Sequence, residues 1–88
     1  MKYQVIISET ALKQLLKCDP QIAVLIYSFL KKKLENCENP RYIGTALKGN
    51  LKGLWRYRVG SYRLLCLIED DKIIITVLEV GHRKEVYK

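Results

Sequence analysis

Residues 54–69 read LWRYRVGSYRLLCLIE, and this stretch decides the fold. Aromatic and aliphatic side chains dominate it on both sides of Gly60-Ser61, as expected for two β-strands joined by a tight turn. A glycine followed by one further residue is typical of a type II′ turn. We therefore predict an antiparallel hairpin with strands at about 54–59 and 62–69.

The two-residue turn also fixes which side chains face each other. Arg58 lies opposite Arg63, and directly opposed residues share one face of a sheet. Arg56 falls on the same face because side chains alternate along a strand. The other face collects the residues that we expect to form the core: Tyr57, Val59, Tyr62, Leu64 and Cys66.

Three arginines on one small face are a poor choice for stability, because opposed like charges destabilise a sheet. A bound anion would explain them, since arginine makes forked contacts to phosphate. The alternative is that a carboxylate from elsewhere in the chain folds over and pairs with them. The candidates for that carboxylate are Glu69, Glu79 and Glu85.

The flanking sequence completes an α+β pattern. Ser8 is a good helix cap, and Asp19 followed by Pro20 marks the start of a second helix. The predicted elements are a strand at about 2–7, helices at about 9–17 and 20–37, a polar loop at about 41–53, a last strand at about 72–79 and a tail from Gly81. The fold is then a strand, a two-helix hairpin and a three-stranded antiparallel meander, with the helices packed on one face of the sheet.

The length of 88 residues predicts one domain, spanning 1–88, with a single hydrophobic core. No apolar run approaches the ~20 residues that a membrane-spanning helix needs. The N-terminus also lacks the apolar stretch of a signal peptide. We therefore expect a cytoplasmic protein with no membrane partner.

Positive charge is concentrated in the second half of the chain. There are 16 Lys and Arg against 9 Asp and Glu, which gives a net charge of +7. From Arg41 to Arg63 the sequence holds six basic residues and no acidic residue. Such a block produces a directional field, so its expected partners are phosphate groups or an acidic protein.

Neither a metal nor another cofactor is expected. Cys18, Cys37 and Cys66 are scattered and form no CxxC pair, which predicts buried, reduced thiols rather than a disulfide framework or a zinc site. The sequence also holds no HExxH, phosphate-binding loop, GxSxG motif or dense cluster of carboxylates.

The tail contains three residues that can do chemistry: His82, Arg83 and Tyr87. Histidine titrates near neutral pH without help, and a tyrosine ring can stack on a base. The simpler interpretation makes His82 an ordinary surface residue and Tyr87 a packing anchor. A position beside an arginine-bearing face favours a functional role for both.

Three segments together are similar to a known family. LKG at 47–49, LWRYRVGSYRL at 54–64 and VGHRKEVY at 80–87 resemble the RelE/ParE superfamily of type II toxins, and more closely its RelE branch. The resemblance extends to the length, the helix pair and the meander. It implies a metal-independent endoribonuclease that cleaves messenger RNA in the ribosomal A site. It also implies a RelB-like antitoxin, with operator DNA bound only by the toxin–antitoxin complex.

The resemblance places the active face on the strands and the tail. By motif position its basic residues are Arg56, Arg58 and Arg63 on the strands, with Arg83 and Tyr87 in the tail and His82 adjacent. We predict catalytic roles for Arg58, Arg63, His82, Arg83 and Tyr87. We predict that the RNA backbone is held by Arg56, Lys48 and Lys52.

The chain departs from the family at one point, because some members have Lys where this chain has Arg56 and Arg58. A guanidinium effectively never loses its proton, so the role of these two arginines is expected to be electrostatic. Proton transfer then falls to His82 or Arg83. The reaction would be attack of an RNA 2′-hydroxyl on the adjacent phosphate, leaving a cyclic phosphate and a free 5′-hydroxyl.

Two other functions stay open. A ParE-like toxin inhibits DNA gyrase without nuclease activity, and the joint presence of the arginines and Tyr87 favours the nuclease over it. The second is a non-toxic module that binds nucleic acid. Leu65 and Leu67 share the face of the arginines and either pack under the tail or receive an antitoxin helix.

Overall fold

The computed structural model describes residues 2–82. Its helices are α1 (Glu9–Lys17) and α2 (Pro20–Phe29), and α2 continues into a π-helical turn, η1 (Leu30–Leu34). Its strands are β1 (Gln4–Ile7), β2 (Thr45–Ala46), β3 (Trp55–Val59), β4 (Tyr62–Glu69) and β5 (Ile74–His82). A short 3-10 turn, η2 (Gly49–Leu51), lies between β2 and β3.

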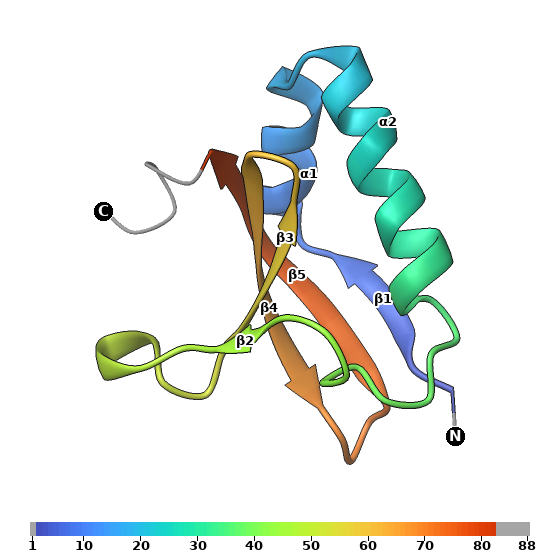
Figure 1. Ribbon diagram of the computed structural model, residues 1–88, viewed down its shortest axis with the longest axis vertical. Helices are drawn as coiled ribbons and strands as arrows, with labels where there is room; N and C mark the ends of the chain where they lie inside the picture. The colour runs from blue at the N-terminus through green and yellow to red at the C-terminus, as the bar shows by residue number, and fades with distance from the viewer. Residues whose placement is uncertain (1, 83–88) are drawn as a thin grey trace.

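These strands form one mixed sheet in the order β1-β5-β4-β3-β2. The predicted meander is its centre, and α1 and α2 pack on one face of the sheet (Figure 1), which confirms the α+β fold. The pairing of the two strands at the edges of the sheet, β1 and β2, was not predicted. The first strand pairs parallel with β5, with Gln4 opposite Ile74, and the two-residue β2 lies inside the segment predicted as loop.

Both helices begin where their capping residues predict. The Ser8 Oγ accepts a hydrogen bond from the Ala11 N–H at 3.0 Å, and the Asp19 Oδ1 accepts one from the Gln21 N–H at 2.9 Å. These bonds satisfy N–H groups that have no partner within the first turn of a helix. Pro20 follows Asp19 at the first helical position, where its missing N–H does no harm.

The second helical segment ends at Leu34, before the predicted end near residue 37. Its last turn is π-helical, with the Glu35 N–H donating to the Leu30 carbonyl at 2.8 Å. The next residue, Asn36, adopts a left-handed backbone with φ of 65°, and its N–H donates to the Tyr3 carbonyl at 2.8 Å. The helix therefore stops early because the chain turns to bond with the residues that lead into β1.

The hydrophobic core lies between the helices and the sheet. Its buried residues are Ala11, Leu15, Ile26, Leu30, Leu34, Tyr57, Val59, Leu64, Cys66, Ile75, Val77 and Val80. The Tyr57 ring contacts Phe29 with centroids 5.9 Å apart, and its hydroxyl donates to the Pro40 carbonyl. Burial raises the pKa of Tyr57 further above neutral pH. As predicted, β3 and β4 supply this face with alternate residues.

β5 is longer than predicted and contains a bulge. Its pairing with β4 shifts between Leu65–Glu79 and Cys66–Val77, so Leu78 is the extra residue. Val77 and Val80 both reach the core for this reason, although they are three residues apart. The prediction that a tail begins at Gly81 was wrong, because β5 continues to pair through His82, which lies opposite Tyr62.

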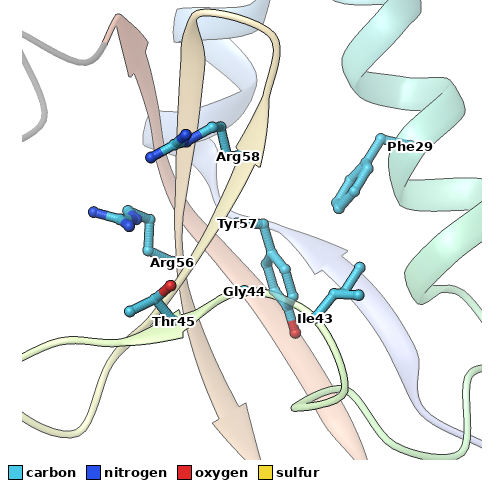
Figure 2. Close-up of a pocket in the computed structure, with 7 residues that line it drawn as sticks. All are labelled: Phe29, Ile43, Gly44, Thr45, Arg56, Tyr57 and Arg58. Carbon is cyan, nitrogen blue, oxygen red and sulfur yellow. The ribbon is translucent and has the colours of Figure 1, made fainter.

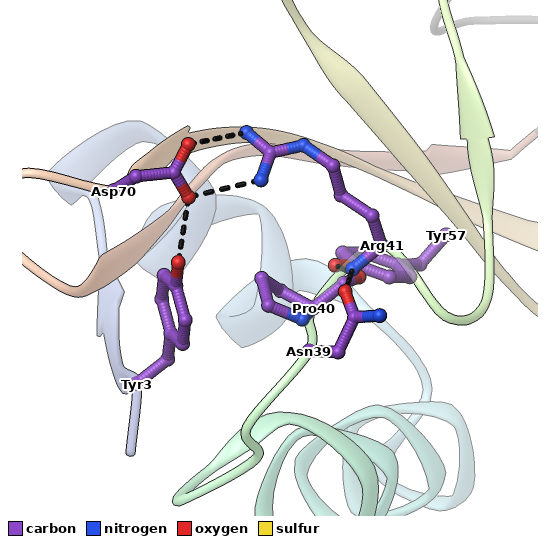
Figure 3. A network of polar contacts seen from close by, with 6 residues as sticks. All are labelled: Tyr3, Asn39, Pro40, Arg41, Tyr57 and Asp70. Carbon is purple, nitrogen blue, oxygen red and sulfur yellow. Dashed lines mark hydrogen bonds and ion pairs between the residues drawn. The ribbon is translucent and has the colours of Figure 1, made fainter. Parts of the chain in front are cut away.

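Arg41, the first residue of the acid-free basic block, is held away from the arginines of the hairpin. It makes two contacts with Asp70 in the β4–β5 turn, at 2.9 and 3.1 Å, and the Tyr3 hydroxyl donates to the same carboxylate at 2.6 Å (Figure 3). This network joins three segments that are distant in sequence. It anchors the loop that leads from the helices toward β2.

The network predicts a measurable dependence of stability on pH. Hydrogen bonds from Arg41 and Tyr3 hold the pKa of Asp70 below its ordinary value. Because the folded pKa is the lower one, this stabilisation is present above the unfolded pKa of about 3.9 and is lost as pH falls through the folded pKa. Urea unfolding between about pH 5 and pH 2 should show a larger loss of stability in the wild type than in Asp70→Asn. An equal loss of stability in the wild type and in Asp70→Asn would contradict this prediction.

Candidate functional site

The β3–β4 hairpin has the predicted register. Arg58 lies opposite Arg63, Arg56 opposite Leu65 and Val59 opposite Tyr62. Figure 2 shows Arg56 and Arg58 pointing to one side of β3, while Tyr57 points to the other side, toward Phe29. The sheet face that carries Arg56, Arg58 and Arg63 is called the arginine face below.

Arg63 occupies the centre of this face. It lies on β4 between Arg58 on β3 and Gly81 on β5, and its Nε and Nη1 atoms are buried. Arg58 is exposed, and Arg56 is partly buried beside Thr45 of β2. The face therefore presents one guanidinium set into the sheet and two nearer its edge. Such an arrangement suits an anion that is approached from several directions.

The sequence left open whether a carboxylate neutralises these arginines. Glu69 is ion-paired with Lys72 at 3.3 Å, and Glu85 lies outside the described residues. Glu79 lies opposite Leu65 and is exposed, so it shares the arginine face with Arg63. Alternation along β4 places Glu69 on the same face, but six residues from Arg63 at the far end of the strand, so Glu79 is the nearer of these two carboxylates.

His82 does not join the arginine face. It lies opposite Tyr62, which in turn lies opposite the core residue Val59, so all three point to the helix-covered side of the sheet. Its ring makes an edge contact with Tyr62, with centroids 5.7 Å apart and planes at 84°. The prediction that His82 lies beside the arginine face was therefore wrong. Arg83 and Tyr87 lie outside the described residues.

Lys48 and Lys52 flank η2 on the loop between β2 and β3, and both are exposed. This loop projects beyond the sheet at the β2 edge (Figure 1). It leads directly into β3, the strand of Arg56 and Arg58. The two lysines therefore extend the basic surface past the edge of the sheet.

A cavity of about 240 Å³ adjoins β3 at the same edge and was not predicted. Its lining residues are Phe29, Ile43, Gly44, Thr45, Arg56, Tyr57 and Arg58 (Figure 2). Gly44 has φ of +90°, and the Trp55 Nε1–H donates to the Ile43 carbonyl at 2.8 Å, so the loop is folded tightly onto β3. The one signal in the sequence was the glycine within the polar loop.

Neither Cys37 nor Cys66 offers a reactive thiol to this site, and of the three cysteines predicted to be buried, Cys18 and Cys37 are only partly buried. Cys66 is buried in the core, and burial raises the pKa of its thiol to about 12. Burial also raises the pKa of Cys37, and no disulfide joins the three cysteines. Within residues 2–82 no group of three or more His, Cys, Asp or Glu side chains is arranged to hold a metal ion.

The helices of the described chain are all too short or too polar to cross a bilayer.

The chain is similar in sequence to known toxins. A family model for the ParE toxin of the type II toxin–antitoxin system parDE matches residues 5–87. Toxin RelG of Mycobacterium tuberculosis is 33% identical over 88 residues, covering 100% of this chain and 99% of RelG. Toxin RelE of the same organism is 30% identical over 86 residues, covering 98% of this chain and 87% of that protein.

Solved structures show the same likeness. A chain of the toxin–antitoxin complex RelBE2 from Mycobacterium tuberculosis superposes with a TM-score of 0.85 at 32% identity, over 97% of this chain and 95% of that one. A mutant of Escherichia coli RelE in the free state gives a TM-score of 0.76 at 27% identity, over 99% and 88%. Both fold and sequence therefore agree over nearly the whole length.

Proposed function

This chain belongs to the RelE/ParE superfamily of type II toxin–antitoxin toxins, and from that premise we propose that it inhibits translation by cleaving messenger RNA on the ribosome. The observation that carries the proposal is the convergence of Arg56, Arg58 and Arg63 on one face. A toxin that acts on RNA needs concentrated positive charge at the phosphate that reacts. The reaction would take place in the cytoplasm, where ribosomes translate.

The proposed reaction is an internal transfer at phosphorus. The 2′-oxygen of one nucleotide bonds to the adjacent phosphorus while the bond to the 5′-oxygen of the next nucleotide breaks, giving a cyclic phosphate and a 5′-hydroxyl. One proton leaves the 2′-hydroxyl and one is delivered to the departing 5′-oxygen. The crowded phosphate gains negative charge in the transition state, and fixed cations that face it lower the barrier.

The described residues supply the electrostatic part of this mechanism. Arg63, set between neighbouring strands, and the exposed Arg58 opposite it are proposed to bind the reacting phosphate. Arg56, Lys48 and Lys52 would hold the flanking RNA backbone along the β2 edge of the sheet. Tyr87 is proposed to stack on a base. Arg83 is proposed to stabilise the negative charge that builds on the departing 5′-oxygen, with water carrying the proton to it, because a guanidinium keeps its own protons.

The protein offers few side chains that could transfer a proton. We therefore propose that the substrate is oriented by another component. Holding the reacting atoms in line can supply a large share of rate acceleration, and the ribosome would do this for a message in its A site. The net charge of +7 favours docking onto ribosomal RNA. Free RNA is therefore expected to be a poor substrate.

The proposed protein partner is a RelB-like antitoxin, because solved relatives of this fold include complexes with RelB. Leu65 is almost fully buried on the arginine face, so of these two leucines only the partly buried Leu67 presents apolar surface beside the cations. An acidic, amphipathic antitoxin segment would match both features. Operator DNA is proposed as a ligand of the toxin–antitoxin complex only.

The test is inducible expression of the chain followed by primer-extension mapping of a translated message. Cuts that depend on translation, and that disappear when the start codon of the reporter is removed, support the proposal. A message that stays intact while growth stops would contradict it.

The match to the ParE family model keeps a second function in view, inhibition of DNA gyrase without nuclease activity. A supercoiling assay with purified protein separates the two. Gyrase inhibition with no cutting of messenger RNA would select this alternative, and cutting without any effect on supercoiling would exclude it.

The placement of His82 yields a prediction about proton transfer. Because it lies on the helix-covered side against Tyr62, His82→Ala should change the cleavage rate by no more than about threefold, whereas loss of a true acid–base group costs about 10²–10⁴-fold. The rate is measured over a range of pH in a cell-free translation system. A hundredfold loss of cleavage rate in His82→Ala, with a shifted pH profile, would contradict this prediction and show that His82 is the acid or the base.

A further inference from the structure

The end of β5 is held by α1 rather than by a neighbouring strand. β1 pairs with β5 only as far as Ile7 opposite Val77. Beyond Val77 the edge of β5 away from β4 has no strand beside it within the described chain. α1 packs against this part of β5 and takes the place of the missing strand.

Within residues 2–82, three hydrogen bonds join Ser8, the cap of α1, and Gln14 of α1 to this part of β5. The Ser8 N–H donates to the Val77 carbonyl at 2.9 Å, and the Ser8 hydroxyl donates to the Leu78 carbonyl, also at 2.9 Å. The Gln14 Oε1 accepts from the Val80 N–H at 2.6 Å. Leu78 is the bulged residue, so Ser8 bonds to the bulge and to the residue before it, and Gln14 bonds to Val80, two residues after it.

The bulge decides which way the last residues of β5 point. With it, Glu79 and Gly81 lie on the arginine face, and Val80 and His82 lie on the helix side. Without it, regular alternation would place Glu79 opposite Leu64 in the core and Val80 opposite Arg63. The geometry at Leu78 thus sets what stands beside the central arginine.

We propose that Gln14 is a positioning residue: its side-chain carbonyl clamps the bulge of β5 and fixes the register in which the end of that strand meets Arg63 and Tyr62. Its link to catalysis rests on the proposed nuclease function. The clamp itself does not, because it concerns the folded protein alone.

The test compares Gln14→Met, which keeps the length but removes the acceptor, with Gln14→Glu, which keeps an acceptor oxygen. Gln21→Met is the matched control, because Gln21 is an exposed glutamine in the first turn of α2. Ser8 is not used, because its hydroxyl also caps α1. All measurements are made well below the melting temperature of each variant.

Two readouts report the clamp. The ring protons of His82 lie against the Tyr62 ring, and their NMR shifts should move toward those of a free histidine in Gln14→Met. Hydrogen exchange at the Val80 amide should rise by about tenfold or more, while core amides of β4 keep their protection. Gln14→Glu and Gln21→Met should retain wild-type values. Unchanged His82 shifts and Val80 exchange in Gln14→Met would overturn the clamp.

A third readout reports the link to catalysis. Single-turnover cleavage on programmed ribosomes should show a maximal rate lower by about tenfold in Gln14→Met, with the half-saturating ribosome concentration unchanged and the rate restored in Gln14→Glu. An unchanged rate beside altered His82 shifts would overturn the positioning role. If the wild type cuts no translated message, the proposed function fails, and the NMR and exchange results still decide the clamp.

Discussion

Replacing Arg63 with alanine is expected to lower the rate of message cleavage by about 10²–10³-fold, the usual effect of removing one fixed electrostatic contact to a transition state. Arg63 is central on the arginine face, and its Nε and Nη1 atoms are buried, so its guanidinium is held in place before RNA arrives. A cation that needs no reorganisation stabilises developing charge better than a mobile one.

The measurement is single-turnover cleavage of a ribosome-bound message by purified variants. Arg63→Lys keeps the charge but loses the forked donors, so its rate should lie between those of the wild type and Arg63→Ala. Lys33→Ala is the matched control, since Lys33 is an exposed cation on η1 and its loss changes the net charge equally. We expect Arg83→Ala to behave like Arg63→Ala.

Folding must be checked beside activity, because Arg63 is partly buried and the aliphatic stem of a buried arginine can contribute to stability. Circular dichroism melting should show Arg63→Ala folded at the assay temperature. A folded Arg63→Ala that cleaves at the wild-type rate would remove the arginine face as the reaction site. A loss of the same size in Lys33→Ala would mean that net charge, rather than this face, drives activity.

Replacing Gly44 with alanine is expected to destabilise the fold by about 3 kcal/mol or more. A Cβ built at Gly44 would lie 2.4 Å from the Trp55 Nε1, 2.6 Å from the Arg56 carbonyl oxygen and 2.9 Å from the Tyr57 Cδ1. The Arg56 oxygen cannot move aside easily because it belongs to the backbone. The Trp55 Nε1 cannot move easily because its N–H donates a hydrogen bond to the Ile43 carbonyl. The φ of +90° adds strain for any residue other than glycine.

Gly53 offers the matched control for this prediction. Its φ is +95°, close to that of Gly44, but a Cβ there meets nothing within 4 Å. Gly53→Ala should therefore report backbone strain alone, about 1 kcal/mol, and the difference between the variants isolates the crowding. Urea unfolding measures both. Equal losses would show that the loop relaxes and that the contact with Trp55 does not hold it onto β3.

The sequence predicted the parts of the site that depend on local rules. A two-residue turn and the alternation of side chains were enough to bring Arg56, Arg58 and Arg63 to one face, and the register of β3 and β4 agrees. The caps Ser8 and Asp19 likewise predicted where the helices begin. Each of these inferences needs only neighbours in sequence or across one tight turn.

The sequence could not predict features that depend on contacts between distant segments. The left-handed Asn36 ends the second helix because its N–H bonds with Tyr3, and the Gly44 loop closes a cavity because it rests on Trp55. The bulge at Leu78 reverses the alternation along β5 and moves His82 to the face opposite the arginines. The alternation of side chains in the sequence does not reveal where a strand will hold one extra residue.

By itself, then, the sequence determined an α+β chain whose central hairpin concentrates guanidinium groups on one side and apolar groups on the other. Only the tertiary structure decided what borders that side: a parallel first strand at one edge, a short strand and a basic loop at the other, and a bulge gripped by Ser8 and Gln14. The physical reason is the distance along the chain over which each interaction acts. Turn geometry and side-chain alternation act within a few residues, whereas strand partners and bulges are set by hydrogen bonds between segments up to 70 residues apart.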